Sequence, residues 1–226
     1  MIIDCISDLH GFYPKLKGGD LLIIGGDLTP FDKIHEYADF FRWLKKQDYE
    51  KKVLIAGNHD VFISKGWPQT KEEADTCAEI REMVGEGPQD FDYLCDSGCE
   101  FGGFKIWGSP WSLWFHGINP KCKAFTGSEQ DLANKYCKIP RDTDILITHT
   151  PPFGILDECS KGRVGSNELR SLILSRRRMP KLKLHVFGHI HEMGGCMFES
   201  SLCKFVNAAI MDENYDPVHE PRMIEL

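Results

Sequence analysis

The sequence has no long apolar run and no excess of basic residues. None of its apolar stretches approaches the about 20 residues that a membrane-spanning helix needs. Met1 is followed by a short apolar segment without a basic region before it, so no secretory signal is expected. The net charge is −7, and an extended nucleic-acid surface needs clustered Lys and Arg to displace counterions. We therefore expect a cytoplasmic protein without a membrane or extended nucleic-acid partner.

Paired cysteine motifs and internal repeats are also missing. The nine cysteines form no C-x-x-C pair. Several of them, such as Cys5 and Cys203, lie inside apolar runs, where a thiol packs as a small hydrophobe. This usage predicts free thiols in a reducing compartment. No low-complexity tract or linker interrupts the ordinary globular composition, 42% apolar and 27% charged. We expect one domain over residues 1–226.

Apolar runs and segments with helical spacing alternate along the chain. The predicted strands cover residues 1–6, 20–24, 53–56, 144–148 and 184–187, and the predicted helices cover 31–46, 128–137 and 166–177. We also predict a polar helix with a loop over 68–94, a hairpin over 101–107, and short β segments near 195–198 and 203–206. This alternation favours an α/β fold whose parallel strands have their carboxyl ends at one edge.

Five short polar clusters follow these apolar runs. They are Asp8-Leu9-His10, Gly26-Asp27, Gly57-Asn58-His59-Asp60, Thr148-His149 and Gly188-His189-Ile190-His191. Carboxylate and amide oxygens together with imidazole nitrogens are suitable ligands for a pair of catalytic divalent metals. Because ligands in open α/β sheets bind outside the carboxyl ends of the strands, we expect the five clusters to meet there.

In order and in residue type, the clusters resemble the signature of the calcineurin-like metallophosphoesterase superfamily: D-x-H, G-D, G-N-H-[DE], H and G-H-x-H. Within it, residues 55–59, 110–115, 148–152 and 184–188 are similar to the small metallophosphoesterase-domain proteins related to class III cyclic nucleotide phosphodiesterases. The resemblance implies a four-layer α/β/β/α sandwich of two mixed β-sheets flanked by helices. It also implies a dimetal site at the carboxyl ends of the strands.

The resemblance further implies which residues bind two ions of manganese, iron or zinc. One metal would be held by Asp8, His10, Asp27 and His191, and the other by Asp27, Asn58, His149 and His189. His59 would not be a ligand in this pattern. It would stabilise the phosphoryl group and protonate the leaving oxygen, with Asp60 beside it raising its pKa. Asn58 and His59 would both contact the substrate.

Other polar and aromatic residues allow two interpretations. Trp111, Trp114 and Phe115 either stack a nucleobase or pack beneath a long loop. Asn207 either lies at the edge of the site or supplies a turn-forming amide. The arginines at 176–178 are expected to form a solvated helix end, where cations suit the helix dipole.

These motifs predict a dimetal-dependent enzyme that hydrolyses small phosphodiesters or nucleotides by metal-activated water attack. A phosphomonoesterase is the first alternative, but Asp60 is followed by Val61-Phe62 and not by an arginine that would bind a more highly charged phosphate. The second alternative is a metal-bearing scaffold without turnover. The intact histidines His59, His189 and His191 favour an enzyme over a scaffold. A homodimer is compatible with this interpretation.

Overall fold

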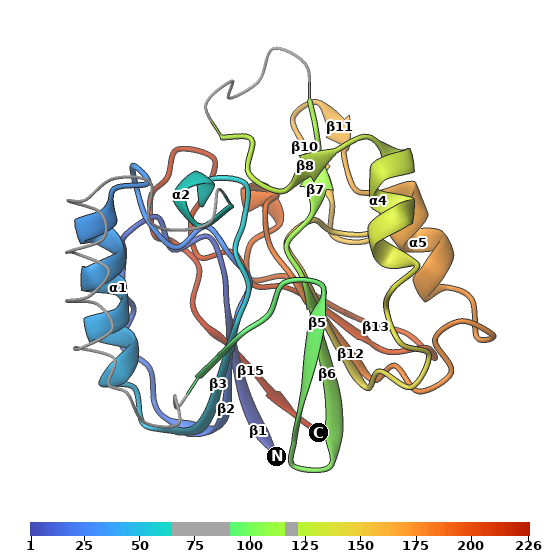
Figure 1. The fold of residues 1–226 in the computed structure, drawn as a ribbon, viewed down its shortest axis with the longest axis horizontal. Helices are drawn as coiled ribbons and strands as arrows, with labels where there is room; N and C mark the ends of the chain where they lie inside the picture. The colour runs from blue at the N-terminus through green and yellow to red at the C-terminus, as the bar shows by residue number, and fades with distance from the viewer. Residues whose placement is uncertain (65–90, 116–121) are drawn as a thin grey trace.

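Two β-sheets pack face to face between helices in the computed structural model, which describes residues 1–64, 91–115 and 122–226 (Figure 1). One sheet has the strand order β15-β1-β2-β3-β4 and the other β13-β14-β12-β9-β6-β5. Both sheets are mixed, because parallel central strands are joined by antiparallel strands at their edges. The predicted α/β/β/α sandwich is confirmed.

The five-stranded sheet contains the amino-terminal strands. It consists of β15 (Arg222–Glu225), β1 (Ile2–Ile6), β2 (Gly19–Ile24), β3 (Tyr49–Leu54) and β4 (Phe91–Tyr93). Strands β1 and β2 are almost continuously apolar because both faces of the sheet are covered. Their parallel register aligns Ile6 with Ile24, so the two strands end at the same level.

The six-stranded sheet is built from the second half of the described chain. It consists of β13 (Met197–Glu199), β14 (Lys204–Asn207), β12 (Leu184–Phe187), β9 (Ile145–Thr148), β6 (Phe104–Ser109) and β5 (Ser97–Phe101). Two short ladders lie outside the sheets: β7 (Ser112–Leu113) with β8 (Thr126–Gly127), and β10 (Glu158–Cys159) with β11 (Gly162–Arg163). The predicted hairpin is confirmed as β5–β6, with Phe101 opposite Phe104 across the glycine turn.

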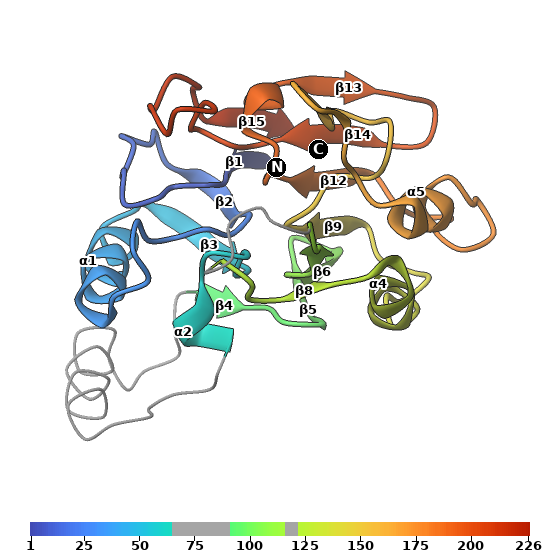
Figure 2. The ribbon, with the colours of Figure 1, turned by 90° about the horizontal axis from the view of Figure 1, so that it is seen from above.

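Helices cover the outer face of each sheet, as seen from above in Figure 2. Helix α1 (Ile34–Lys45) packs against the five-stranded sheet, and α4 (Glu129–Tyr136) and α5 (Asn167–Ile173) pack against the six-stranded sheet. Short helices α2 (Val61–Ser64) and η1 (His191–Met193) lie near the edge where the central strands end. The hydroxyl of Ser128 accepts the Asp131 amide, which confirms the predicted cap of α4.

The main core lies between the two sheets. Ile3 and Ile23 from one sheet meet Ile147 and Val186 from the other, and all four are fully buried. Burying side chains of this size contributes about 1.5–3 kcal/mol each before the entropy cost of ordering them. This dry contact fixes the two sheets relative to each other. The loops that leave the ends of both sheets are therefore held in a common frame.

Some boundaries differ from the sequence predictions. Helix α5 ends at Ile173 and not near Arg177, because the chain turns back at Ser175, whose amide donates to the Leu172 carbonyl. The arginine run therefore lies in the turn after the helix, where the Arg176 guanidinium donates to the Ser201 carbonyl. The helix predicted from residue 68 lies outside the described residues, and its expected loop contains β4 instead. Strand β15 was not predicted.

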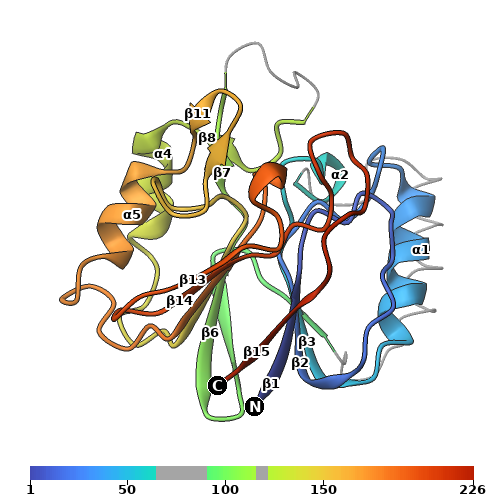
Figure 3. The same ribbon diagram turned by 180° about the vertical axis from the view of Figure 1, so that it is seen from behind.

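The parallel strands of both sheets point their carboxyl ends to the same edge of the molecule, whereas both termini lie at the opposite edge (Figure 3). There the amino group of Met1 donates to the Leu226 carbonyl at 2.6 Å. None of the described cysteines forms a disulfide. Within the described ranges, no helix combines the length and apolarity that crossing a membrane requires.

Candidate dimetal centre

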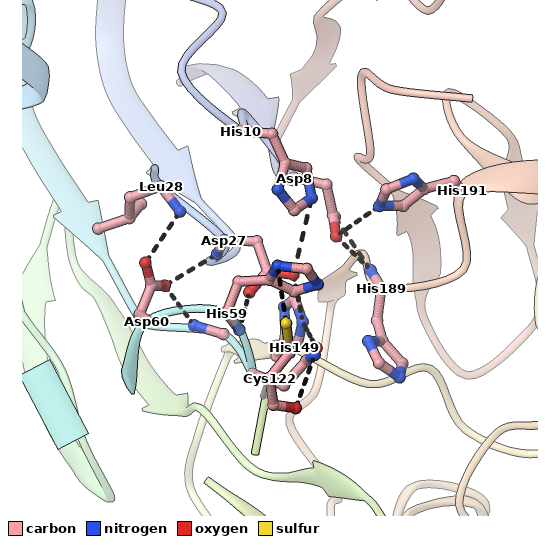
Figure 4. A network of polar contacts seen from close by, with 12 residues as sticks. Asp8, His10, Asp27, Leu28, His59, Asp60, Cys122, His149, His189 and His191 are labelled. Atoms are coloured by element: carbon pink, nitrogen blue, oxygen red, sulfur yellow. Dashed lines mark hydrogen bonds and ion pairs between the residues drawn. The ribbon is translucent and has the colours of Figure 1, made fainter. Parts of the chain in front are cut away.

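The loops after β1, β2, β3, β9 and β12 meet at the common strand edge (Figure 4). The first two are joined by backbone hydrogen bonds: the Asp8 amide donates to Gly26 at 2.9 Å, and the His10 amide donates to Asp27 at 3.0 Å. The amide of His189, after β12, donates to both carboxylate oxygens of Asp8 at 3.1 and 2.9 Å. Asp8 and His189, which are 181 positions apart in sequence, are thereby held together by protein contacts alone.

Four site residues adopt left-handed backbone conformations. The φ angles are 53° for Asp8, 42° for His10, 53° for Asp27 and 70° for His189. Each such residue without the freedom of glycine costs on the order of 1–3 kcal/mol and persists only when its surroundings determine it. Here the turns aim the side chains back over the strand ends. The concentration of strain at one edge is typical of a functional site.

Two glycines allow the ligand loops to approach one another. A Cβ atom on Gly57 would lie 2.2 Å from an Asp27 carboxylate oxygen, and one on Gly188 would lie 2.1 Å from an Asp8 carboxylate oxygen. Real Cβ atoms do not come this close to other heavy atoms, so a side chain at either position would displace a ligand. The glycines of G-N-H and G-H-x-H therefore have a steric role at the ligand carboxylates.

The ligand atoms of Asp8, His10 and His191 form one group in which all lie within 4.8 Å of one another. His191 Nε2 is 3.2 Å from Asp8 Oδ1, while its Nδ1 is 2.9 Å from the Asp212 carbonyl oxygen. That carbonyl accepts the Nδ1 proton and fixes Nε2 as the nitrogen facing the site. This group matches the first predicted metal position.

A second group consists of Asp8, Asp27 and His149. His149 Nε2 lies 3.4 Å from Asp27 Oδ2 and 3.0 Å from the Asn58 amide oxygen, and its Nδ1 lies 2.9 Å from the Gly25 carbonyl. The same Asp27 oxygen lies 3.8 Å from His10 Nε2. Asp27 Oδ2 thus lies near one histidine of each group, and the Asp8 carboxylate belongs to both groups.

The remaining histidines surround these groups. The ring of His189 lies 4.9 Å from that of His149 and faces the pocket described below. The half-buried ring of His59 lies 4.7 Å from that of His10, and a ligand atom of His59 groups with His10 and Asp27. All seven predicted ligands and His59 therefore gather at one place.

The pKa values of the histidines show that the two buried carboxylates of the centre attract positive charge. Burial lowers the pKa of His10 to about 4 and that of His189 to about 3, so both imidazoles keep a free lone pair at neutral pH. Burial acts the same way on His149, but Asp27 outweighs it and raises the pKa to about 9. The pKa of His191 likewise rises to about 8 through its hydrogen bond to Asp8, which outweighs burial. The two carboxylates thus attract a proton where no cation balances them.

The donor set fits a pair of divalent metals. His10 Nε2 is buried and makes no hydrogen bond, although a buried nitrogen of this kind normally has a partner. It points toward Asp27, and His10 contributes a ligand atom to the groups with Asp8 and with Asp27. Two buried carboxylates, an amide oxygen and several imidazoles are the mixed ligands that manganese, iron and zinc accept.

Asp60 has a different role from the predicted one. Its buried carboxylate accepts the backbone amides of Gly57 at 2.7 Å, Asp27 at 3.0 Å and Leu28 at 3.1 Å, and also the Tyr37 hydroxyl. These contacts turn it away from the His59 ring, toward the loops after β2 and β3 (Figure 4). The prediction that Asp60 lies beside His59 is therefore wrong. Asp60 positions the ligand loops.

A pocket of about 470 Å³ opens above the ligand groups. Besides ligands and His59, its described wall contains Phe115, Cys159, Ser160, Lys161, Val164, Ile190, Glu192, Glu213 and Tyr215. Phe115 is the member of the predicted aromatic cluster that faces this pocket. The Trp111 indole instead donates to Asp96 at 3.1 Å and packs in the core beside α4, and Trp114 lies next to Lys123.

Asn207 lies behind the pocket and not in its described wall. Its buried amide donates to the carbonyls of Ile190 at 2.9 Å and Leu156 at 3.2 Å, and its oxygen accepts the Ala209 amide. Ile190 separates His189 from His191. Of the two interpretations of Asn207, the structure supports the structural amide, which holds the G-H-x-H loop.

Tyr215 and Cys122 are site residues that sequence reasoning missed. The Tyr215 ring packs edge-on against His10 at 4.8 Å and His191 at 5.2 Å, with φ of 65° in a tight turn. Cys122 Sγ lies 3.3 Å from His59 Nδ1. The Asp212–Asp216 turn residues signal a tight turn, but nothing in the sequence around either residue shows that it reaches the strand edge.

Comparison with known proteins agrees with this geometry. A family model described as calcineurin-like phosphoesterase matches residues 1–193. Metallophosphoesterase domain-containing protein 1 of Homo sapiens is 36% identical over 238 residues, covering 98% of this chain and 70% of that protein. A UPF0046 protein of Caenorhabditis elegans is 34% identical, covering 98% of this chain and 59% of its own. The crystal structure of the protein TT1561 of Thermus thermophilus has a TM-score of 0.59 at 17% identity, covering 91% of this chain and 88% of that one.

The fold and the ligand groups define a metallophosphoesterase. The chain belongs to the calcineurin-like phosphoesterase family, and its relatives include the metallophosphoesterase domain-containing and UPF0046 proteins. The resemblance inferred from the five motifs is confirmed. Members of this family normally bind two divalent metals, and the candidate ligands described above agree with that. The chain is accordingly a metal-dependent phosphoester hydrolase by family.

Proposed function

We propose that this protein is a phosphodiesterase that hydrolyses small phosphodiesters of the nucleotide type. The observation that carries the proposal is the chemical composition of the pocket above the two ligand groups. Its described wall holds one cation, Lys161, and two carboxylates beyond the ligands, Glu192 and Glu213, together with the aromatic rings of Phe115 and Tyr215. A ligand for this wall has low negative charge and two organic groups.

A phosphodiester meets both requirements. It carries one negative charge at neutral pH, whereas a monoester approaches two because its second pKa is about 6. The extra charge of a monoester would face Glu192 and Glu213 without an arginine fork among the described wall residues. The second ester group of a diester would instead gain contact area on Phe115 and Tyr215.

The residues of the chain divide the catalytic work. Asp8, His10, Asp27 and His191 would hold one metal, and Asp27, Asn58, His149 and His189 would hold the other. When bound, the metals supply Lewis-acid activation of the attacking water and of the phosphoryl oxygen. His59, half-buried at the pocket and beside the His10 ring, holds a proton toward the leaving oxygen.

The test compares bis-p-nitrophenyl phosphate with p-nitrophenyl phosphate. Purified protein is stripped of metal by a chelator and assayed after addition of manganese, zinc or iron. We expect faster turnover of the diester, restored by added metal and lost again in Asn58→Ala. Asn134→Ala, an exposed asparagine on α4, is the matched control and should keep wild-type rates. Preference for the monoester would contradict the proposal, and no turnover with two bound metals would favour a scaffold.

A further inference from the structure

A short segment from a different part of the chain is docked on the Asn58-His59 motif. The Asn58 side-chain amide donates to the Cys122 carbonyl at 3.3 Å. The Ala124 backbone amide donates to the Asn58 carbonyl at 3.1 Å, and Cys122 Sγ lies 3.3 Å from His59 Nδ1. Three contacts therefore join residues 122–124 to two consecutive residues of the catalytic loop, across 64 positions of sequence.

The docked segment is itself anchored. It leads into β8, which pairs with β7, and the Ser112 amide donates to the Phe125 carbonyl at 2.9 Å. Phe125 adopts a left-handed conformation with φ of 49°, and Ala124 is buried. A segment held by β8 and by its backbone bond to Asn58 can hold a partner in one orientation. The contact between Cys122 and His59 is therefore set by the fold around it.

The thiol bears on which nitrogen of His59 carries the proton. Cys122 Sγ lies 3.3 Å from Nδ1, within reach of a thiol donor. When the thiol donates, Nδ1 accepts, and the proton of a neutral imidazole is on Nε2. Figure 4 shows the other edge of this ring turned toward the side of the site where Asp8 and His191 lie.

We infer that Cys122 is a positioning residue for His59: its thiol fixes the imidazole so that Nε2–H faces the substrate's leaving oxygen and donates a hydrogen bond to it. The inference rests on the proposed function, because it assigns His59 the contact with that oxygen. A side chain that only fills space would need no polar atom at this place. A serine hydroxyl offers the same donor with similar geometry, whereas alanine removes it and leaves the backbone contact to Asn58 intact.

The first test compares Cys122→Ala and Cys122→Ser on the diester substrate. We expect Cys122→Ala to lower kcat about tenfold with KM changed less than about twofold, because only the orientation of the hydrogen-bond donor is lost. Cys122→Ser should stay within about threefold of wild type. In a His59→Gln background, Cys122→Ala should cause no further loss, since it acts through His59. Cys137→Ala, an exposed cysteine after α4, is the matched control.

The second test does not depend on turnover. Long-range proton–nitrogen NMR spectra of metal-free protein report the tautomer of the His59 ring, and we expect Nε2–H in wild type and Cys122→Ser but a mixture in Cys122→Ala. A wild-type kcat and an unchanged tautomer in Cys122→Ala would overturn the inference while leaving the proposed function standing. If wild type fails to hydrolyse the diester, the proposed function fails, and the tautomer of Cys122→Ala alone decides whether Cys122 positions His59.

Discussion

The ligands Asp8 and Asp27 each follow a buried parallel strand, whereas the pocket wall around Lys161 and Tyr215 is built by loops that connect or follow the sheets. We call the ligand loops the floor and the residues above them the wall. The floor carboxylates of Asp8 and Asp27 are buried and accept backbone amides from other loops. Lys161 and Tyr215 in the wall are exposed, Tyr215 by 46%.

This difference suits the floor to metal binding and the wall to substrate selection. A buried floor with fixed carboxylates holds cations at constant positions, which the chemistry of phosphoester cleavage requires. A wall on loops can vary in sequence without disturbing the floor, so it determines which esters fit. Substitutions in the floor should therefore abolish turnover, and substitutions in the wall should change substrate preference.

The largest effect is expected from Asp27→Ala. Loss of the carboxylate between the two ligand groups removes a ligand from both metal positions, and we expect kcat to fall by at least about a thousandfold. Steady-state kinetics with the diester measure this. Asp39→Ala, an exposed residue that pairs with Arg42 on α1, is the control and should retain activity. Full activity in Asp27→Ala would refute the division between floor and wall.

Asp60→Ala tests whether the floor loops depend on their hydrogen bonds to the Asp60 carboxylate. The change leaves three backbone amides without their buried acceptor, and we expect the free energy of unfolding to fall by about 3 kcal/mol. Chemical denaturation measures the loss. The exposed Asp142→Ala serves for comparison and should change stability by less than about 0.5 kcal/mol. Equal stability of both variants would show that Asp60 does not position the ligand loops.

His59 lies between the floor and the wall, and His59→Gln should have an intermediate effect on turnover. We expect kcat to fall about a hundredfold, because a proton donor to the leaving oxygen is lost, while metal content stays at the wild-type value. Kinetics and elemental analysis of the same sample check both statements. His35→Gln, on the exposed face of α1, should behave as wild type. Loss of metal together with activity would make His59 a ligand and contradict its assigned role.

Tyr215→Ala should have the smallest effect. The ring contacts two ligand histidines and faces the pocket, so its removal should raise KM for the aryl diester about fivefold and lower kcat by less than about threefold. A comparison of aryl and methyl diesters measures the contribution of the ring. A collapse of kcat with unchanged KM would place Tyr215 in the floor instead.

Sequence patterns predicted the floor and most of the central strands. Nearly continuous apolar runs such as Ile2–Ile6 mark strands buried on both faces, and the polar clusters that follow them mark their ends. Strand β15 escaped prediction because Arg222–Glu225 alternates exposed and buried residues at a sheet edge and is too short for a clear period. Its place is determined by pairing with β1.

The wall and the supporting contacts could not be predicted for a related reason. Asp60 sits next to His59 in sequence, yet its carboxylate turns to backbone amides of a loop 32 and 33 residues away. Cys122 meets His59 across 63 positions. Contacts of this kind depend on which loops the fold brings together and not on local spacing. Sequence spacing alone therefore identifies ligands at strand ends but not the residues that orient them.

Metal stoichiometry tests the central claim most directly. Chelated protein is titrated with manganese by calorimetry, and bound metal is counted by elemental analysis after desalting, for wild type and for Asp27→Ala. The account predicts two metal ions per chain in wild type and at most one in Asp27→Ala, because Asp27 stands between both ligand groups. Fewer than two ions per wild-type chain, or two ions retained by Asp27→Ala, would contradict it.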